Sequence, residues 1–244
     1  MNGLERLLGP NPPRVLVVVA HQDDETIGAG ALISRLPDCW LVHLTDGATR
    51  EARFVEGFTG IREEYAAARR RELAAALDLA GLGPQRRIAI EGIVDQEACF
   101  ALPRLAREVL RLCRELRPGI ALVEMPLYHA RPGTTRGDDL VKQEFLPPPE
   151  GAGIEAVRRD LSAAERALKL RMYDGFVTQR HILAWFLPPV YETFRPAPAY
   201  DFTQPPHAGS LQYELWGFPV TGGRWRELAR AAIEELALAP ALVK

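Results

Sequence analysis

One short segment, residues 20–25, combines side chains that could bind a cation. It reads Ala-His-Gln-Asp-Asp-Glu and places one imidazole and three carboxylates within six residues. Histidine and carboxylate together suit Zn²⁺, Mn²⁺ or Fe²⁺, and acids packed this closely repel one another unless a cation relieves the repulsion. A helix N-terminus is the alternative interpretation, because acidic side chains there complement the helix dipole and Asp caps well. Spacing alone supports both interpretations equally.

The elements around this segment predict an α/β sheet. Residues 14–20 form a β-branched run that is apolar on both faces, as in a central parallel strand. Further strands are predicted over residues 40–44, 87–90 and 120–125, and helices over residues 27–36, 61–82 and 102–116. This alternation is typical of a sheet with crossover helices. Because ligands bind at the carboxyl ends of strands in open α/β sheets, residues 20–25 lie where a site is expected.

The second half of the chain is less regular. Residues 131–153 are rich in Pro and Gly, and residues 187–206 carry so many prolines that we expect neither a central strand nor a helix there. We expect one long helix over residues 155–186, or two helices broken near Gly175, then a late strand over 211–216 and a final helix over 225–238. The simplest interpretation is one α/β domain with an irregular C-terminal elaboration.

Composition excludes several classes of protein. The chain has 244 residues, 47% of them hydrophobic, and a net charge of -2, so neither a disordered chain nor a nucleic-acid binder is expected. Its three cysteines are too few, and odd in number, for a disulfide framework. No signal peptide is visible, and no apolar run approaches the about 20 residues that span a bilayer. We therefore expect a cytoplasmic protein without a transmembrane segment.

The string in residues 20–25 resembles the Ala-His-Pro-Asp-Asp-Glu signature of the PIG-L/LmbE-like family of zinc-dependent N-acetylglucosamine deacetylases. Gln22 stands here in place of the usual proline. Residues 44–48 look like the family's second-strand segment, residues 69–72 match its Arg-x-x-Glu, and residues 206–214 resemble a late segment of some bacterial members. The resemblance implies a single deacetylase domain over residues 1–244, with a Rossmann-like, mostly parallel sheet and helices on both faces.

The resemblance also implies roles for individual residues. His21 and Asp24 would bind zinc, or another divalent metal such as Fe²⁺. Asp23 would be the general base that takes a proton from the attacking water, and Glu25 would brace the site from behind the metal ligands. Arg69 would contact the substrate.

The third metal ligand departs from the family pattern. It normally comes from a His-x-Asp-His motif after a later strand, and the corresponding region here contains no such motif. We favour His129, because it follows the predicted strand 120–125 and so lies at the ligand-binding edge; Asp138 or Asp139 is the alternative. The same departure leaves the proton donor to the leaving amine unassigned.

Other polar residues are weaker candidates. His207 lies in a loop flanked by Pro and Gly, and Arg62 follows the second strand, so both could contact a substrate. A solvated charged loop is the alternative for Arg62. We expect His43, inside a strand, to be part of the core and His181 to lie on the surface.

Two functions follow from these observations. The first is a metal-dependent N-deacetylase acting on a small-molecule or glycoconjugate substrate of the N-acetylglucosamine type. The second, motivated by the missing His-x-Asp-His, is a non-catalytic or altered descendant that binds a glycan or a partner through the same cleft. A nucleotide-binding protein is poorly supported, because no Gly-x-Gly-x-x-Gly or phosphate-binding loop follows a strand. The sequence gives no indication of the oligomeric state.

Overall fold

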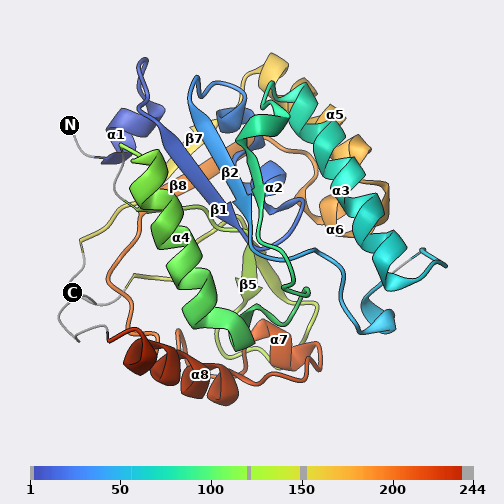
Figure 1. The fold of residues 1–244 in the computed structure, drawn as a ribbon, viewed down its shortest axis with the longest axis vertical. Coiled ribbons are helices and arrows are strands. Elements are labelled where there is room, and N and C mark those ends of the chain that lie inside the picture. The colour runs from blue at the N-terminus through green and yellow to red at the C-terminus, as the bar shows by residue number, and fades with distance from the viewer. Residues whose placement is uncertain (1–2, 56, 120–121, 149–152, 238–244) are drawn as a thin grey trace.

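The first half of the chain builds a parallel sheet. The computed structural model describes residues 3–55, 57–119, 122–148 and 153–237. The strands β1 (Val15–Val19), β2 (Cys39–His43) and β3 (Arg87–Ala89) lie side by side in that order, and both pairs are parallel. The last residues of the three strands are register partners, so the strands end at one common edge (Figure 1). The predicted strands over residues 14–20, 40–44 and 87–90 are confirmed as elements, but in the described part of the chain β2 is the middle strand, so the central position predicted for residues 14–20 is wrong.

Helices cover both faces of this sheet. Leu41 and Val42 are adjacent on β2 and fully buried, and they point to opposite faces. Leu41 packs in a core with Ile27 of α2 (Asp24–Ile33) and residues of α3 (Arg62–Leu79), whereas Val42 packs with Leu105 and Leu112 of α4 (Leu102–Leu116). Burial on both faces explains the apolar run of β2, whereas Val18 of β1 is 38% exposed.

The remaining strands pair antiparallel. β4 (Val123–Glu124), β8 (Tyr191–Pro196) and β7 (Val157–Asp160) form a second sheet in that order, and β5 (Tyr128–Ala130) pairs with β6 (Leu140–Lys142). The fold is thus a mixed α/β fold around a three-stranded parallel sheet. The predicted strand over residues 120–125 is observed as β4, with residues 120–121 outside the described part.

Further helices complete the described part of the chain. They are α1 (Gly3–Leu8), α5 (Ala163–Gly175), α6 (Arg180–Leu183), α7 (Gln212–Leu215) and α8 (Gly222–Glu235), with 3₁₀ helices at Ala52–Phe54, Pro84–Arg86, Ala98–Ala101, Val177–Gln179 and Ala184–Phe186. Among them, α5 contributes Met172 and Tyr173 to the core that holds Leu41. The final helix over 225–238 is observed as α8, and residue 238 lies outside the described part. Among the described residues, no helix combines the length and apolarity needed to cross a membrane.

Three expectations for the second half are wrong. The region 187–206 contains β8, the middle strand of its sheet, because Pro189 precedes the strand and Pro196 is its last residue. The strand interior therefore keeps its backbone donors. Residues 211–216 form the helical turn α7 rather than a strand, since the Glu214 carboxylate accepts from the backbone N–H groups of Leu211 and Gly222.

The region 155–186 does not begin with a helix. The Ser162 hydroxyl accepts from the backbone N–H of Glu165, and the Glu165 carboxylate accepts from the N–H of Ser162 at 2.9 Å. This reciprocal capping box fixes the start of α5 at Ala163. The preceding residues Val157–Asp160 are therefore free to form the edge strand β7.

Candidate active site

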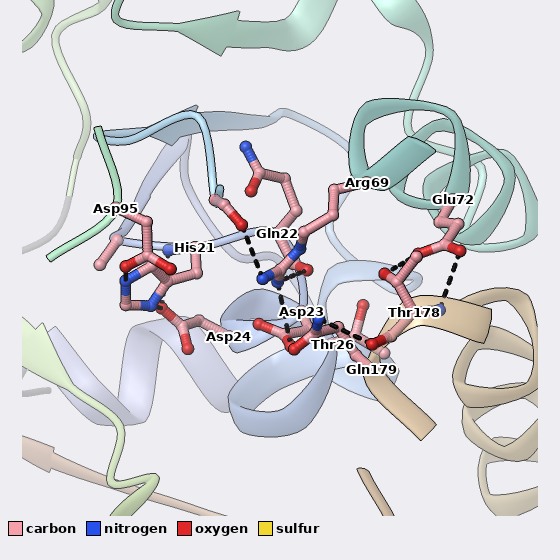
Figure 2. A network of polar contacts seen from close by, with 12 residues as sticks. His21, Gln22, Asp23, Asp24, Thr26, Arg69, Glu72, Asp95, Thr178 and Gln179 are labelled. Carbon is pink, nitrogen blue, oxygen red and sulfur yellow. Dashed lines mark hydrogen bonds and ion pairs between the residues drawn. The ribbon is translucent and has the colours of Figure 1, made fainter. Parts of the chain in front are cut away.

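Three loops at the carboxyl edge of the parallel sheet bring polar side chains together. Residues 20–23 follow β1, residues 44–48 follow β2, and Asp95 lies beyond β3. The loops are joined by backbone contacts, since Leu44 N–H donates to Val19 O at 2.9 Å and Asp46 N–H donates to Ile93 O at 2.9 Å. Figure 2 shows the side chains converging from these loops and from α3.

His21 lies between two carboxylates. Its Nε2 is 2.7 Å from Asp95 Oδ1 and its Nδ1 is 3.3 Å from Asp24 Oδ2 (Figure 2). Asp24 Oδ2 also accepts from the His21 backbone N–H at 2.9 Å. Desolvation lowers the pKa of His21, but the attraction of Asp95 and Asp24 outweighs it and raises that pKa well above its usual value. Desolvation raises the pKa values of Asp24 and Asp95. The nearby His21 imidazole opposes this effect, and both pKa values are lowered overall.

Asp23 is buried beside an arginine. Its Oδ2 is 3.2 Å from Arg69 Nη2, and its backbone adopts φ 155 and ψ -26, which non-glycine residues rarely do. Backbone strain of this kind concentrates at functional sites. Burial raises the pKa of Asp23 to about 7, against the opposing effect of Arg69. A carboxyl with such a pKa can exchange a proton near neutral pH.

Arg69 anchors the loops as well as Asp23. Its Nη1 donates to Gly47 O at 3.0 Å and its Nη2 to Gln22 O at 2.7 Å. Glu72, one turn further along α3, points elsewhere and accepts from the N–H and hydroxyl of Thr178 (Figure 2). The arginine of the Arg-x-x-Glu pair is therefore part of the cluster, whereas the glutamate ties α3 to the segment after α5.

Glu25 lies beneath the cluster and is fully buried. One carboxylate oxygen accepts from the Thr26 hydroxyl at 2.6 Å, and the other accepts from the Asp23 N–H at 3.2 Å and lies 3.1 Å from His43 Nε2. His43 is 2% exposed, so it belongs to the core as predicted, but it also contacts this acid. Glu25 thus fixes the Asp23 backbone from inside.

Arg62 acts on the cluster through a carboxylate. Its Nη1 donates to Asp46 Oδ2 at 2.5 Å and to Ala48 O at 3.0 Å. Asp46 Oδ1 in turn accepts from the backbone N–H of Asp95 at 3.3 Å. These contacts fix the loop that carries Asp95. They do not test the predicted role of Arg62 in substrate binding, which stays a prediction.

The described contacts do not join His129 to the cluster. Its Nδ1 pairs with Ala130 O at 2.8 Å, and its Nε2 is buried with no hydrogen-bond partner among the described residues. Burial raises the pKa of the neighbouring Tyr128, with smaller contributions from Tyr213 and the cluster acids. Since successive strand residues point to opposite faces, His129 points away from the face that carries Tyr128.

The alternatives to His129 have local partners. Asp138 pairs with Arg136 at 2.8 Å, and Asp139 pairs with Arg131 at 3.1 Å. The Nδ1 of His207 pairs with the carbonyl oxygen of the next residue. None of these contacts reaches His21 or Asp24, so the roles of these three residues in the site stay predictions.

Sequence reasoning missed Asp95, which lies 2.7 Å from His21 Nε2. Asp95 has no surrounding motif. The available signal was its position beyond the third predicted strand, at the edge where the first two loops also lie.

The donor set was compared with what a metal ion requires. Two atoms bound to one zinc ion at about 2.0–2.1 Å in tetrahedral geometry lie about 3.3 Å apart, and His21 Nδ1 and Asp24 Oδ2 are 3.3 Å apart. A metal-ligating histidine usually donates its other ring N–H to a carboxylate, and Asp95 occupies that position. Within the described residues, no group of three or more His, Cys, Asp or Glu side chains is arranged to hold a metal ion. Two donors therefore fit, and the third is not supplied there.

The protein thus has a mixed α/β fold, and its candidate site is an acid–imidazole cluster at the carboxyl ends of parallel strands. Residues 16–132 match the family described as PIG-L, GlcNAc-PI de-N-acetylase, so this segment of the chain carries a PIG-L domain match. No curated protein matches the chain.

Two solved structures share the fold. The A40926 pseudoaglycone deacetylase is 15% identical, with a TM-score of 0.55 over 75% of this chain and 96% of its own. A deacetylase of the teicoplanin biosynthesis pathway is 13% identical, with a TM-score of 0.50 over 75% of this chain and 97% of its own. At these identities the likeness establishes the fold alone.

Proposed function

We propose that this chain is a metal-dependent hydrolase that removes the N-acetyl group from a small-molecule or glycoconjugate substrate of the N-acetylglucosamine type. The observation that carries the proposal is the meeting of Asp23 with His21 and Asp24 at the carboxyl edge of the sheet. The family match over residues 16–132 supports the same reaction, as do the deacetylase names of the two structures with the shared fold.

His21 and Asp24 would hold the metal ion, zinc or another divalent ion such as Fe²⁺. A bound zinc ion supplies a Lewis acid that polarises a carbonyl group and lowers the pKa of water. Asp95 would orient the imidazole of His21 through the 2.7 Å contact to Nε2. The sequence favours His129 as the third ligand, but its Nδ1 contact with Ala130 O argues against that role, and the zinc content of His129→Ala tests it.

The protein's own groups then divide the proton transfers. Asp23 would take a proton from the attacking water, and the same carboxyl, once protonated, would return the proton to the leaving amine. A pKa of about 7 suits both steps. Arg69 holds the Asp23 side chain in place.

A second function is favoured by one observation. The described residues offer no group of three metal-binding side chains, which fits an altered descendant that binds a glycan or partner through the same cleft without hydrolysis. The two functions differ in one measurable property, the release of acetate.

The test measures zinc content and acetate release on protein purified without chelator. The probe substrate is p-nitrophenyl N-acetyl-β-D-glucosaminide, and the variants are His21→Ala and, as a control, Glu227→Gln. Glu227 is an exposed acid of α8 that pairs with Arg224 on the same helix, so its loss should leave activity unchanged. The hydrolase proposal expects near-stoichiometric zinc, and acetate release that His21→Ala abolishes. Metal-free, fully folded protein without acetate release on this and other N-acetylhexosamine conjugates would favour the binding function.

A further inference from the structure

The helix that begins in the candidate site is interrupted in its middle. α2 runs from Asp24 to Ile33, but Ala29 has φ -146 and ψ 16, which is not a helical conformation. In an uninterrupted α-helix, the N–H of Ala31 would donate to the carbonyl of Ile27 four residues earlier. At a break of this kind, backbone groups need other partners.

A buried ion pair contacts both sides of the break. Lys169 Nζ, from α5, donates to Ile27 O at 2.8 Å and lies 2.9 Å from Glu192 Oε1, from β8. The Glu192 carboxylate accepts from Ala31 N–H at 2.8 Å and from Leu32 N–H at 3.0 Å. The ion pair therefore stands between the carbonyl and the N–H groups that regular helix would have joined.

Both charges of the ion pair are buried, so the pair carries a desolvation cost that only well-placed partners can offset. Lys169 and Glu192 are each 0% exposed. Burial lowers the pKa of Lys169 despite its anionic partner, and Arg159 also lies 3.3 Å from the Glu192 carboxylate. Because replacing such a pair by apolar residues is often neutral or stabilising, its presence does not follow from stability alone.

The break is directly connected to the catalytic segment. The N–H of Ile27 donates to Asp23 O at 2.8 Å, while the carbonyl of the same residue accepts from Lys169. The first turn of α2, which carries Asp24 and Glu25, is thus held between the Asp23 backbone and the ion pair. Both members of the pair come from beyond residue 132, outside the segment that matches the family.

We propose that Lys169 and Glu192 are positioning residues for the site, which fix the first turn of α2 and through it the side chains of Asp23 and Asp24. This rests on the proposed function, because the positioned groups are those of the proposed reaction. The two residues do not touch the reacting atoms; they act through Ile27 and the backbone of α2.

The experiment compares Glu192→Gln with Leu105→Ala in the zinc-loaded full chain. Leu105 lies in the separate core beneath α4, so its truncation destabilises the fold without touching α2. If Glu192→Gln fails to fold, the double variant Lys169→Met/Glu192→Gln replaces it, because it leaves no unpaired buried charge between these two positions.

Two readouts distinguish positioning from mere stability. The first is the NMR shift of the His21 Cε1–H group, which needs no activity. The second is acetate release from the glucosaminide probe, where kcat should fall about tenfold or more with KM within about twofold, since small misplacements of catalytic groups are costly. Leu105→Ala should lower the Tm and leave both readouts unchanged.

The outcomes separate this proposal from the proposed function. A shifted His21 resonance in the Glu192 variant, with none in Leu105→Ala, supports positioning. An unchanged resonance and unchanged kcat, or equal changes in both variants, would overturn it. If wild-type protein releases no acetate while the His21 resonance still responds to Glu192→Gln, the deacetylase proposal fails and the structural link between Glu192 and the site stands.

Discussion

The carboxylate of Asp23 lies 3.2 Å from the guanidinium of Arg69, and the two side chains are only 6% and 5% exposed. The same guanidinium reaches the carbonyls of Gln22 and Gly47, on the loops after β1 and β2. Arg69 therefore organises the site from α3, the helix that also carries Arg62. Arg69 thus has two roles: it joins the loops after β1 and β2, and it pairs with Asp23, the proposed general base.

Arg69→Met should consequently destabilise the protein strongly. Removing one member of a buried ion pair leaves the other charge without compensation, which costs about 3–5 kcal/mol. Urea unfolding of wild type and variant measures the difference. Arg50→Met is the matched control, since Arg50 forms an exposed pair with Glu97 worth about 0–1 kcal/mol. Equal losses in the two variants would contradict the structural role given to Arg69.

Asp23→Asn should separate metal binding from catalysis. The substitution keeps the shape of the side chain and removes the proton acceptor, so acetate release should fall by about 10²–10⁴-fold. Zinc content should stay at the wild-type level, because His21 and Asp24 remain. Acetate assays and elemental analysis on the same sample check both statements. Activity within a few-fold of wild type would exclude Asp23 as the base.

Asp24 and Asp95 flank the same imidazole but should behave differently towards metal. Asp24→Asn removes a proposed ligand and should abolish stoichiometric zinc binding. Asp95→Asn removes only the carboxylate that orients His21, and losses of such partners typically cost about 10–100-fold in affinity. Titration with a competing chelator measures both affinities. If Asp95→Asn loses more affinity than Asp24→Asn, the two roles are reversed.

Much of this arrangement is readable from the sequence, for physical reasons. Parallel strands end at one edge, so the residues after β1 were bound to lie at the carboxyl edge of the sheet, and the acid–imidazole string marked which of them matter. The capping box of Ser162 and Glu165 was also readable, although the helix start at Ala163 was missed. Such features can be predicted because they depend on residues that are close together in the sequence.

Other features depend on contacts between distant segments. In the sequence, Lys169 and Glu192 have the pattern of ordinary surface charges. They are buried partners because α5 and β8 bring them together at the break in α2. Asp95 likewise carries no local motif, since its contact with His21 depends on where the loop beyond β3 returns to the sheet. Long-range pairing of this sort leaves no periodic signal in a single sequence.

His129→Ala tests the predicted third ligand. The sequence favours this residue because it follows a strand, but the structure pairs its Nδ1 with Ala130 O and points it to the face opposite Tyr128. We therefore expect zinc content equal to wild type in His129→Ala, measured beside His21→Ala, which should lose the metal. A clear fall in zinc content in His129→Ala would instead identify its unpartnered Nε2 as a ligand atom. That result would require β5 to turn towards the cluster when metal is bound, and the Tyr128 ring, now 5.6 Å from the ring of Trp216, would have to move with it.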